Sequence, residues 1–411
     1  MRQVSNLNET PRGMRIAIAF LGRRNAGKSS LLNALVGYDL AIVSDQAGTT
    51  TDPVDKAVEI NPLGPCLVID TAGIDDTGEL GQKRIEKTNA VVSNADVGLI
   101  IIGDGQWTSY EEELVAALQG KQKPIIVVLN KNDRFDYREL EIMLQERKLD
   151  YVTTTAVTDE GIADLKQKIR ELKNVSGLED PSIIGDIIKA GDLVLLVVPI
   201  DTGAPKGRLI LPQVQTIRDI LDNDATAIVV KESELADTLA KLGNPPDLVI
   251  TDSQVVLKVA GIVAEEIPLT TFSTVFSRFK GDLRQMVNGV QTIDKLQNGD
   301  KILIAEACTH HAMADDIGRV KIPRWIVNYT GKKLQFELAA GSAFPADIKD
   351  YRLILQCGGC TISRTAYGNR LQTAAAMGIP ITNYGVAISY VQGVLSRVIR
   401  PFPELQDLFN P

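Results

Sequence analysis

One short segment constrains the fold of this chain more than any other. Residues 22–29 read GRRNAGKS and fit the phosphate-binding pattern GxxxxGK[ST]. The segment follows an apolar run at 15–21, which predicts a buried strand, and precedes a helical pattern at 28–36. A glycine-rich turn that arose by chance would rarely stand in this context. The pattern therefore predicts a strand–loop–helix unit within a parallel α/β sheet.

The residue types in this loop suit a nucleotide phosphate. The glycines let backbone N–H groups wrap the phosphates at the start of a helix. Lys28 would bridge the β- and γ-phosphates, and the Ser29 hydroxyl would bind Mg²⁺. The predicted phosphate-binding residues are Gly22, Asn25, Ala26, Gly27, Lys28, Ser29 and Ser30.

Two later segments would complete the magnesium and γ-phosphate site. Residues 70–73 read DTAG after a predicted strand at 66–70, so Asp70 would join the magnesium shell and the Gly73 N–H would sense the γ-phosphate. Between them and the loop lies GTTTDP at 48–53, where Thr49 and Thr50 would contact the nucleotide and Thr50 would bind Mg²⁺. Lys28, Thr50 and Gly73 are the predicted catalytic residues.

A further motif selects the base. Residues 130–133 read NKND at the end of a predicted strand at 124–130. Guanine presents two adjacent donors, N1–H and the N2 amine, which the Asp133 carboxylate can accept together, whereas adenine lacks that pair. Thr155 and Ala156 stand where a short loop would touch the guanine oxygen. Asn130, Lys131, Asp133, Thr155 and Ala156 are therefore the predicted base-binding residues.

Together these motifs resemble the GTPases of the Era and TrmE type over about residues 14–170. Ile74 follows the DTAG motif where many signalling GTPases carry a water-positioning glutamine, so slow basal hydrolysis is expected. Asn25 resembles the potassium-coordinating asparagine of TrmE-like GTPases; the alternative is a loop asparagine that bonds its own backbone. For Arg23 and Arg24 we expect solvated side chains rather than an arginine finger.

The remainder of the chain repeats the alternation of apolar runs and helical patterns. At roughly 150 residues per domain, 411 residues suggest two to three domains. We predict an α/β protein of three domains with mainly parallel sheets, at 1–172, 178–270 and 271–411, and the first of these would bind GTP. Strands are expected at 97–102, 193–198, 225–230, 248–251, near 267, at 301–305 and at 351–356, and helices at 111–118, 212–221, 233–242, 253–259, 370–376 and 386–398.

The third segment gathers soft metal ligands. Both histidines and three of the four cysteines fall in CTHH at 308–311 and CGGC at 357–360. Both groups follow a predicted strand, at the edge where open α/β sheets bind ligands. Thiolate and imidazole suit zinc or an iron–sulfur cluster, and three cysteines with one histidine could equally form a closed zinc site. Cys308, His310, Cys357 and Cys360 are the predicted metal ligands.

This ligand spacing after a GTPase domain and a motif-free middle segment resembles the HydF-type GTPases of [FeFe]-hydrogenase maturation over essentially the whole chain. The resemblance implies a [4Fe–4S] cluster on Cys308, Cys357 and Cys360, with a fourth iron ligand from His310, His311 or a carboxylate. It also implies that 178–270 is an α/β dimerisation domain and that 271–411 is an iron–sulfur cluster-binding domain. The protein would then be a homodimeric scaffold that accepts a di-iron precursor from radical-SAM maturases and delivers it to apo-[FeFe]-hydrogenase.

Composition restricts the alternatives. A net charge of −8 and 5% aromatic residues argue against nucleic acid as a partner, and so against a ribosome-assembly or tRNA-modification GTPase with a structural zinc site. No apolar run approaches the roughly 20 residues that span a bilayer. Four cysteines do not make a disulfide framework, and the CxxC spacing favours a reducing compartment. The polar segment 1–15 resembles neither a signal nor a transit peptide, so a cytoplasmic location is expected.

Overall fold

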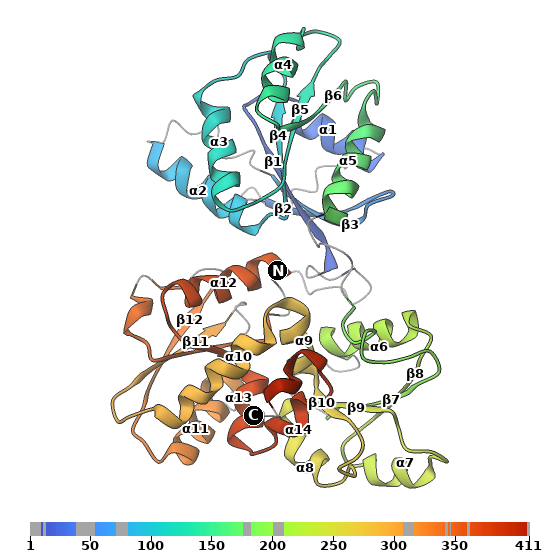
Figure 1. Cartoon of the computed structure of the whole chain (residues 1–411), viewed down its shortest axis with the longest axis vertical. Coiled ribbons are helices and arrows are strands. Elements are labelled where there is room, and N and C mark those ends of the chain that lie inside the picture. Colours follow the sequence, from blue (N-terminus) through green and yellow to red (C-terminus); the bar gives the residue numbers. More distant parts are fainter. Residues whose placement is uncertain are drawn as a thin grey trace. The chain divides into compact units, whose positions relative to one another are not determined.

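The computed structural model describes residue 10 and residues 14–37, 54–70, 81–175, 182–199, 209–306, 316–341, 344–345, 347–359 and 362–408. Within these ranges, the side chains of residues 54–55, 70, 81–87 and 173–175 are not described. Contacts between Cα atoms divide the chain into two compact units, residues 14–180 and residues 181–411 (Figure 1).

The first unit contains one sheet of strand order β2-β3-β1-β4-β5-β6. All neighbouring strands are parallel except β2, which pairs antiparallel with β3. The Ile- and Val-rich strands β1, β4 and β5 are buried along their whole length, as expected for a sheet covered on both faces. The strands are β1 (Ile16–Leu21), β2 (Val54–Ile60), β3 (Gly64–Asp70), β4 (Val97–Ile102), β5 (Ile125–Asn130) and β6 (Asp150–Thr154).

Helices cover both faces of this sheet. Apolar side chains of α1 and α5 pack against one face, and those of α2, α3 and α4 pack against the other. The helices are α1 (Lys28–Val36), α2 (Gly81–Asn94), α3 (Ser109–Gly120), α4 (Arg138–Glu146) and α5 (Ile162–Val175). The doubly wound arrangement brings the carboxyl ends of β1, β3, β4 and β5 to one edge.

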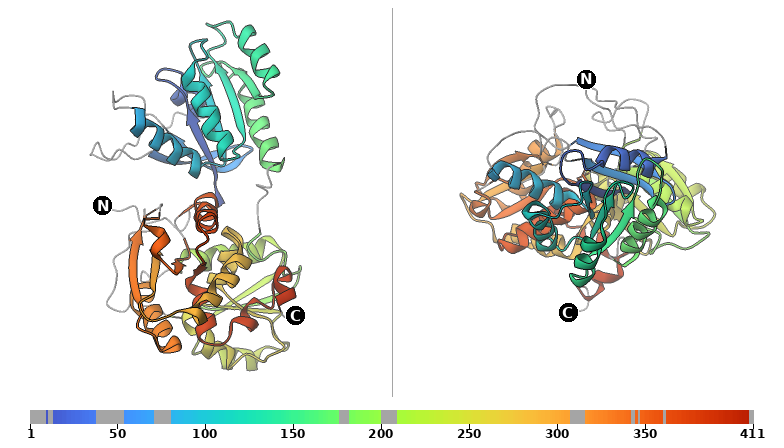
Figure 2. Two further views of the ribbon diagram at one scale, coloured as in Figure 1. Left: turned by 60° about the vertical axis from the view of Figure 1, so that its left-hand side comes forward. Right: turned by 90° about the horizontal axis from the view of Figure 1, so that it is seen from above.

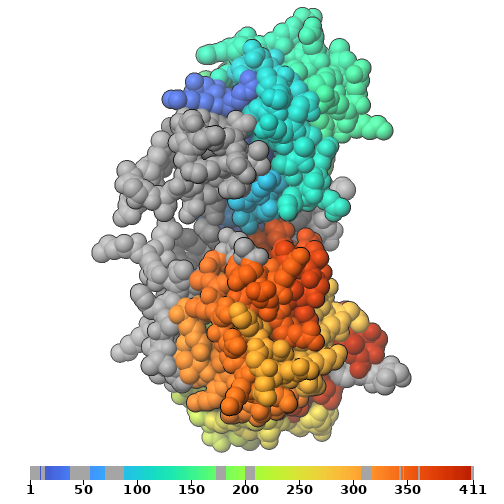
Figure 3. Space-filling model, turned by 90° about the vertical axis from the view of Figure 1, so that its left-hand side faces the viewer, coloured from blue at the N-terminus to red at the C-terminus, as the bar shows by residue number. Residues whose placement is uncertain are grey.

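The second unit contains two parallel sheets, of order β10-β9-β7-β8 and β12-β11-β13-β14. One continuous apolar core joins them, since it draws residues from β7, β9, β11 and β13 as well as from helices α9, α10, α13 and α14. Figures 1 and 2 show α9 and α10, in gold, between the two sheets. The orange face of this unit, which includes the edge strand β12, is seen in Figure 3.

The strands of the second unit are short. They are β7 (Leu193–Val197), β8 (Thr226–Val230), β9 (Leu248–Thr251), β10 (Leu269–Thr271), β11 (Lys301–Glu306), β12 (Gln335–Ala340), β13 (Leu353–Gln356) and β14 (Ile381–Asn383). The helices are α6 (Leu211–Asp222), α7 (Leu235–Lys241), α8 (Val256–Ala260), α9 (Phe272–Lys280), α10 (Leu283–Val290), α11 (Ile322–Thr330), α12 (Arg364–Ala376), α13 (Tyr384–Val391) and α14 (Leu395–Ile399).

The predicted fold class, α/β with mainly parallel sheets, is confirmed. One predicted element was wrong: the single helix at 386–398 is two helices, α13 and α14. Gly393 separates them with a φ of 74°, a left-handed conformation that ends a helix. The boundaries predicted at 172, 178 and 270 stay predictions. None of the helices in the described ranges is long and apolar enough to cross a membrane.

Candidate functional site

The phosphate loop joins β1 to α1 and depends on glycine at two positions. Gly22 has a φ of 148°, and a Cβ atom there would lie 2.4 Å from the carbonyl oxygen of Ile101. Gly27 has a φ of 96°, and a Cβ there would lie 2.2 Å from Nδ2 of Asn130. Larger residues would therefore push the loop off the sheet. Helix α1 begins at Lys28 directly after Gly27, so the first N–H groups of the helix face the loop.

The Lys28 ammonium rests on the loop itself. Its Nζ donates to the carbonyl oxygen of Gly22 and, at 3.0 Å, to that of Arg23. Ser29 and Ser30, in the first turn of α1, are exposed. This arrangement places a cation and two hydroxyls at a helix N-terminus, which is the chemistry that a nucleotide phosphate with Mg²⁺ requires.

Arg23 is held by an ion pair, and the prediction of a solvated Arg23 was therefore wrong. Its Nε and Nη2 donate to the two carboxylate oxygens of Glu111 at 3.0 and 2.6 Å, and its Nη1 donates to Asp104 at 3.0 Å. Glu111 is only 2% exposed and also accepts from the Thr108 N–H at 2.8 Å, which caps α3. The guanidinium thus ties the phosphate loop to α3, and it is not free to act as an arginine finger.

Burial affects the charge state of this pair. Desolvation raises the pKa of Glu111, but the hydrogen bonds from Arg23 and Thr108 together outweigh it and lower the pKa below its usual value. The pair therefore stays ionised. The TxxE pattern at 108–111, a helix-capping signature, predicts the bond between Glu111 and the Thr108 N–H but not the pair with Arg23.

Asn130 connects the base motif to the phosphate loop. It is 1% exposed, and its Nδ2 donates to the carbonyl oxygen of Ala26 at 3.0 Å. Its Oδ1 accepts from the Thr154 hydroxyl and from the Ala156 N–H, each at 3.2 Å. Lys131 reaches the same loop, because its Nζ donates to the Asn25 carbonyl at 2.5 Å. Three segments that the sequence assigned to one nucleotide therefore meet.

Asp133 lies at the exposed end of this arrangement. Its side chain is 49% exposed and lies 3.4 Å from Nε of Arg134, which is itself 70% exposed. A carboxylate in such a weak, solvated pair remains available to accept two hydrogen bonds from a base. The adjacent N–H of Asn132 donates to the Thr154 carbonyl at 3.1 Å, which fixes the loop against β6. Thr155 is buried behind it.

The described residues include only part of the predicted magnesium and γ-phosphate site. Thr49, Thr50 and Gly73 lie outside the described residues, as does the side chain of Asp70. The backbone of Asp70 pairs with Phe20 in parallel register, so β3 ends beside β1, close to where the phosphate loop begins.

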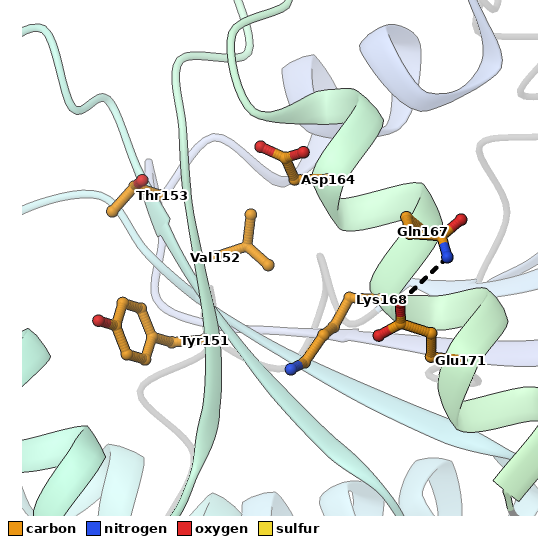
Figure 4. Close-up of a pocket in the computed structure, with 7 residues that line it drawn as sticks. All are labelled: Tyr151, Val152, Thr153, Asp164, Gln167, Lys168 and Glu171. Carbon is orange, nitrogen blue, oxygen red and sulfur yellow. Dashed lines mark hydrogen bonds between the residues drawn. The ribbon is translucent and has the colours of Figure 1, made fainter.

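A separate groove runs between β6 and α5 (Figure 4). Lys168 pairs with Asp150 at 2.7 Å, and Gln167 Nε2 donates to Glu171 at 3.0 Å. The groove includes none of the predicted nucleotide-binding residues, and these four polar side chains satisfy one another. The lining residues are Tyr151, Val152, Thr153, Asp164, Gln167, Lys168 and Glu171.

In the second unit, Cys357 follows β13 directly. Its N–H donates to the Ala305 carbonyl of the neighbouring parallel strand β11 at 3.0 Å. The cysteine is partly exposed and forms no disulfide. Cys308, His310, His311 and Cys360 lie outside the described residues. Within the described ranges no three His, Cys, Asp or Glu residues are grouped so that they could hold a metal ion.

The surroundings of Cys357 are polar and largely buried. Glu306, 5% exposed at the end of β11, pairs with Arg319 at 2.7 Å. The Tyr384 hydroxyl is buried and has no hydrogen-bond partner among the described residues. Desolvation, then the charges of Cys357 and Glu306, raise the Tyr384 pKa well above its usual range. An unpaired buried hydroxyl beside a thiol marks an edge suited to a further polar group.

Three protein-family models match the chain. The model described as 50S ribosome-binding GTPase matches residues 17–131. The model described as hydrogen maturase F dimerization domain matches residues 183–281, and the model for the hydrogen maturase F tetramerization domain matches residues 284–401. The latter two together account for more than half of the 411 residues.

Two curated relatives match part of the chain. The tRNA modification GTPase MnmE of Latilactobacillus sakei is 37% identical over 162 residues, which is 38% of this chain and 34% of the relative. The corresponding protein of Bacillus cytotoxicus is 36% identical over 162 residues, with the same coverage. The chain therefore spans about a third of the length of these relatives. Among solved structures, Aquifex aeolicus Era bound to GDP and AlF4⁻ is 21% identical with a TM-score of 0.32, covering 56% of this chain and 99% of Era.

Proposed function

Because the chain belongs to the hydrogen maturase F family of GTPases, we propose that it is a scaffold and carrier for hydrogenase cluster assembly. It hydrolyses GTP, since residues 17–131 match a GTPase model. In the proposed role it binds a [4Fe–4S] cluster, accepts a di-iron precursor from radical-SAM maturases and delivers that precursor to apo-[FeFe]-hydrogenase. These partners, and a cytoplasmic location, belong to the proposal.

One observation carries the cluster proposal: the hydrogen bond from the Cys357 N–H to the Ala305 carbonyl. It joins the carboxyl ends of β13 and β11, and Cys308 follows Ala305 by three residues. At about 3.5 Å per residue, a segment of that length keeps Cys308 within about 10 Å of the same edge. Cys360 follows Cys357 at CxxC spacing. The bond between the two strand ends and the CxxC spacing support the proposal that the three thiolates meet at this edge.

The donor set fits an iron–sulfur cluster. In the proposal Cys308, Cys357 and Cys360 bind three irons, and His310, His311 or a carboxylate binds the fourth. When bound, a cluster with one replaceable ligand offers an iron to which a second metal unit can attach. Gly359, with a φ of 60°, gives the CGGC loop the left-handed turn that wrapping such a group requires.

In the nucleotide site, Ser29, Thr50 and Asp70 would hold Mg²⁺, and Lys28, Thr50 and Gly73 would stabilise the transferred phosphoryl group. Potassium held by Asn25 would add positive charge beside the phosphates. We propose that GTP binding and hydrolysis reposition the segments around Thr49–Thr51 and Gly73, and so gate the association with partners. The hydrolysis does not change bonds at the cluster.

The family models name dimerization and tetramerization domains, so the chain forms oligomers. We propose a homodimer built through β8. Among the described residues this strand stands at the end of its sheet and pairs with β7 alone, and Val229 is 42% exposed. An apolar strand edge can extend the sheet of a second copy across a twofold axis. Val229→Lys should convert dimers to monomers in analytical ultracentrifugation, and an unchanged sedimentation coefficient would exclude this edge.

A tRNA-modification GTPase with a zinc site is the competing function, since relatives of the first unit carry that name. The two functions differ in the metal that the protein would bind, an iron–sulfur cluster for the scaffold and zinc for the tRNA-modification GTPase. Protein reconstituted anaerobically with iron and sulfide should turn brown and, once reduced, give an electron paramagnetic resonance (EPR) signal of a [4Fe–4S] cluster. A colourless protein that retains only zinc would reject the scaffold function.

A further inference from the structure

A buried lysine holds the loop that carries the CxxC cysteines. Lys280, the last residue of α9, is 4% exposed. Its Nζ donates to the Gly359 carbonyl at 2.6 Å and lies 3.4 Å from the Ile362 carbonyl. These two carbonyls bracket Cys360 in the sequence. A charged group this deeply buried is costly unless it is paired. The carbonyls of the cysteine loop therefore stabilise the buried ammonium, and the ammonium in turn holds the loop.

A second contact fixes the same loop from the side. The Tyr367 ring of α12 is fully buried between two glycines. A Cβ at Gly359 would lie 2.7 Å from Cδ2 of Tyr367, and a Cβ at Gly281 would lie 3.1 Å from its Cδ1. Gly281 directly follows Lys280. The end of α9 and the middle of the CGGC loop are therefore packed against opposite edges of one aromatic ring.

The helix that carries Lys280 belongs to the other half of the unit. Helix α9 lies within residues 183–281, which match the dimerization model, whereas Gly359 lies within the tetramerization match at 284–401. Phe276 and Phe279 of α9 are buried in the core that joins the two sheets. The Arg364 Nε, from α12, donates to the Phe279 carbonyl at 2.9 Å. The cysteine loop is thus anchored to a helix of the half that matches the dimerization model.

We propose that Lys280 is a positioning residue for the cluster. Its ammonium fixes the Gly359 carbonyl and so sets the direction of the CGGC backbone after Cys357. Its positive charge also offsets the negative charge that thiolates and a cluster bring into a buried site. This inference rests on the proposed cluster function. If Lys280 has this role, the geometry of the CGGC loop depends on the position of α9.

Iron binding by reconstituted full-length protein tests this role. Lys280→Met keeps the length of the side chain but removes the charge and the donors. We expect it to bind less than half of the wild-type iron, to lose that iron faster to a chelator, and to hold its remaining cluster at a more negative midpoint potential. Lys280→Arg, which keeps the charge, should restore most of the iron. Lys301→Met, which removes a surface lysine paired with Glu337 at 3.0 Å, is the matched control and should behave as wild type.

A second variant tests the contact from the side of the loop. Gly359→Ala leaves Lys280 intact but pushes a methyl group against Tyr367, and should also lose iron. It keeps the test decisive if Lys280→Met does not fold. Wild-type iron content, chelation rate and midpoint potential in a folded Lys280→Met variant, or in Gly359→Ala if Lys280→Met does not fold, would overturn the role of Lys280. If Cys357→Ser also retained the wild-type cluster, the proposed cluster function itself would fail.

Discussion

The side-chain amide of Asn130 donates to the carbonyl of Ala26, 104 residues earlier in the chain, at 3.0 Å. Both residues are buried, so water cannot replace the bond. The same side chain accepts from Thr154 and Ala156. One asparagine therefore holds the phosphate loop, the base motif and the loop after β6 in a fixed relation. The buried Asn130 thus preorganises the three segments that are predicted to bind the nucleotide.

Asn130→Ala should reduce both stability and GDP affinity. The change removes three hydrogen bonds and leaves the buried Ala26 carbonyl unsatisfied, which costs about 1–3 kcal/mol of unfolding free energy. Urea unfolding and isothermal titration with GDP measure the two effects. Asn94→Ala, which removes a local bond to the Ala90 carbonyl on α2, is the control and should leave GDP affinity unchanged. Equal losses in both variants would contradict the connecting role.

Lys28→Ala should lower the rate of GTP hydrolysis by a factor on the order of 10² or more, because it removes the cation beside the transferred phosphate. Iron content after reconstitution should stay at the wild-type level. Phosphate release and iron quantitation on the same preparation provide both values. Parallel loss of hydrolysis and iron would show that the two sites are not separable. Exposed Lys121→Ala serves as the control for charge.

Potassium should accelerate hydrolysis relative to sodium at equal ionic strength, if the Asn25 side chain binds it. Asn25 has a φ of 63°, and its backbone carbonyl is taken by Lys131. Asn25→Gly removes the amide oxygen without straining this backbone and should remove the difference between the salts. Initial rates in KCl and NaCl measure it. Equal rates for the wild-type protein would exclude Asn25 as a potassium ligand.

The stability of the first unit should fall in acid because of Glu111. Since the pKa of Glu111 is lowered in the folded protein, the carboxylate stabilises the fold above its unfolded pKa of about 4.3. That contribution is lost as the pH falls from there through the lower folded value. Urea unfolding of wild type and Glu111→Gln between about pH 6 and 3 should give curves that converge in acid. A constant difference would contradict the ion pair, and exposed Glu146→Gln is the control.

Local sequence patterns predicted the central strands β1, β3, β4 and β5 of the first unit and its helices α1 and α3. The strand at 97–102 and the helix at 28–36 coincide with β4 and α1 because an uninterrupted apolar run and a glycine-bounded helix leave few alternatives. Other elements were not predicted, among them β2, β6, α2, α4 and α5 of the first unit and several helices and strands of the second. Strand β12 has a half-exposed, irregular pattern, and β14 has only three residues, so neither carries a period that marks a strand.

Motifs predicted which residues gather, but not what holds them. The GxxxxGKS and NKND patterns placed Lys28 and Asn130 at one nucleotide. Nothing local shows that Arg23 pairs with Glu111, since that contact joins residues 88 positions apart. Lys280 belongs to no recognisable motif, and the glycine that follows it gives no sign of burial. Its burial arises only when α9 packs against the loop of a distant cysteine pair.

The most direct test of the cluster proposal is EPR of the reduced, iron-loaded protein, compared between wild type and Cys357→Ser. The proposal predicts a [4Fe–4S] signal that changes on addition of imidazole in wild type, and loss of that signal in the variant at an unchanged GTPase rate. A variant with wild-type iron content and spectrum would show that the edge shared by β11 and β13 does not hold the cluster.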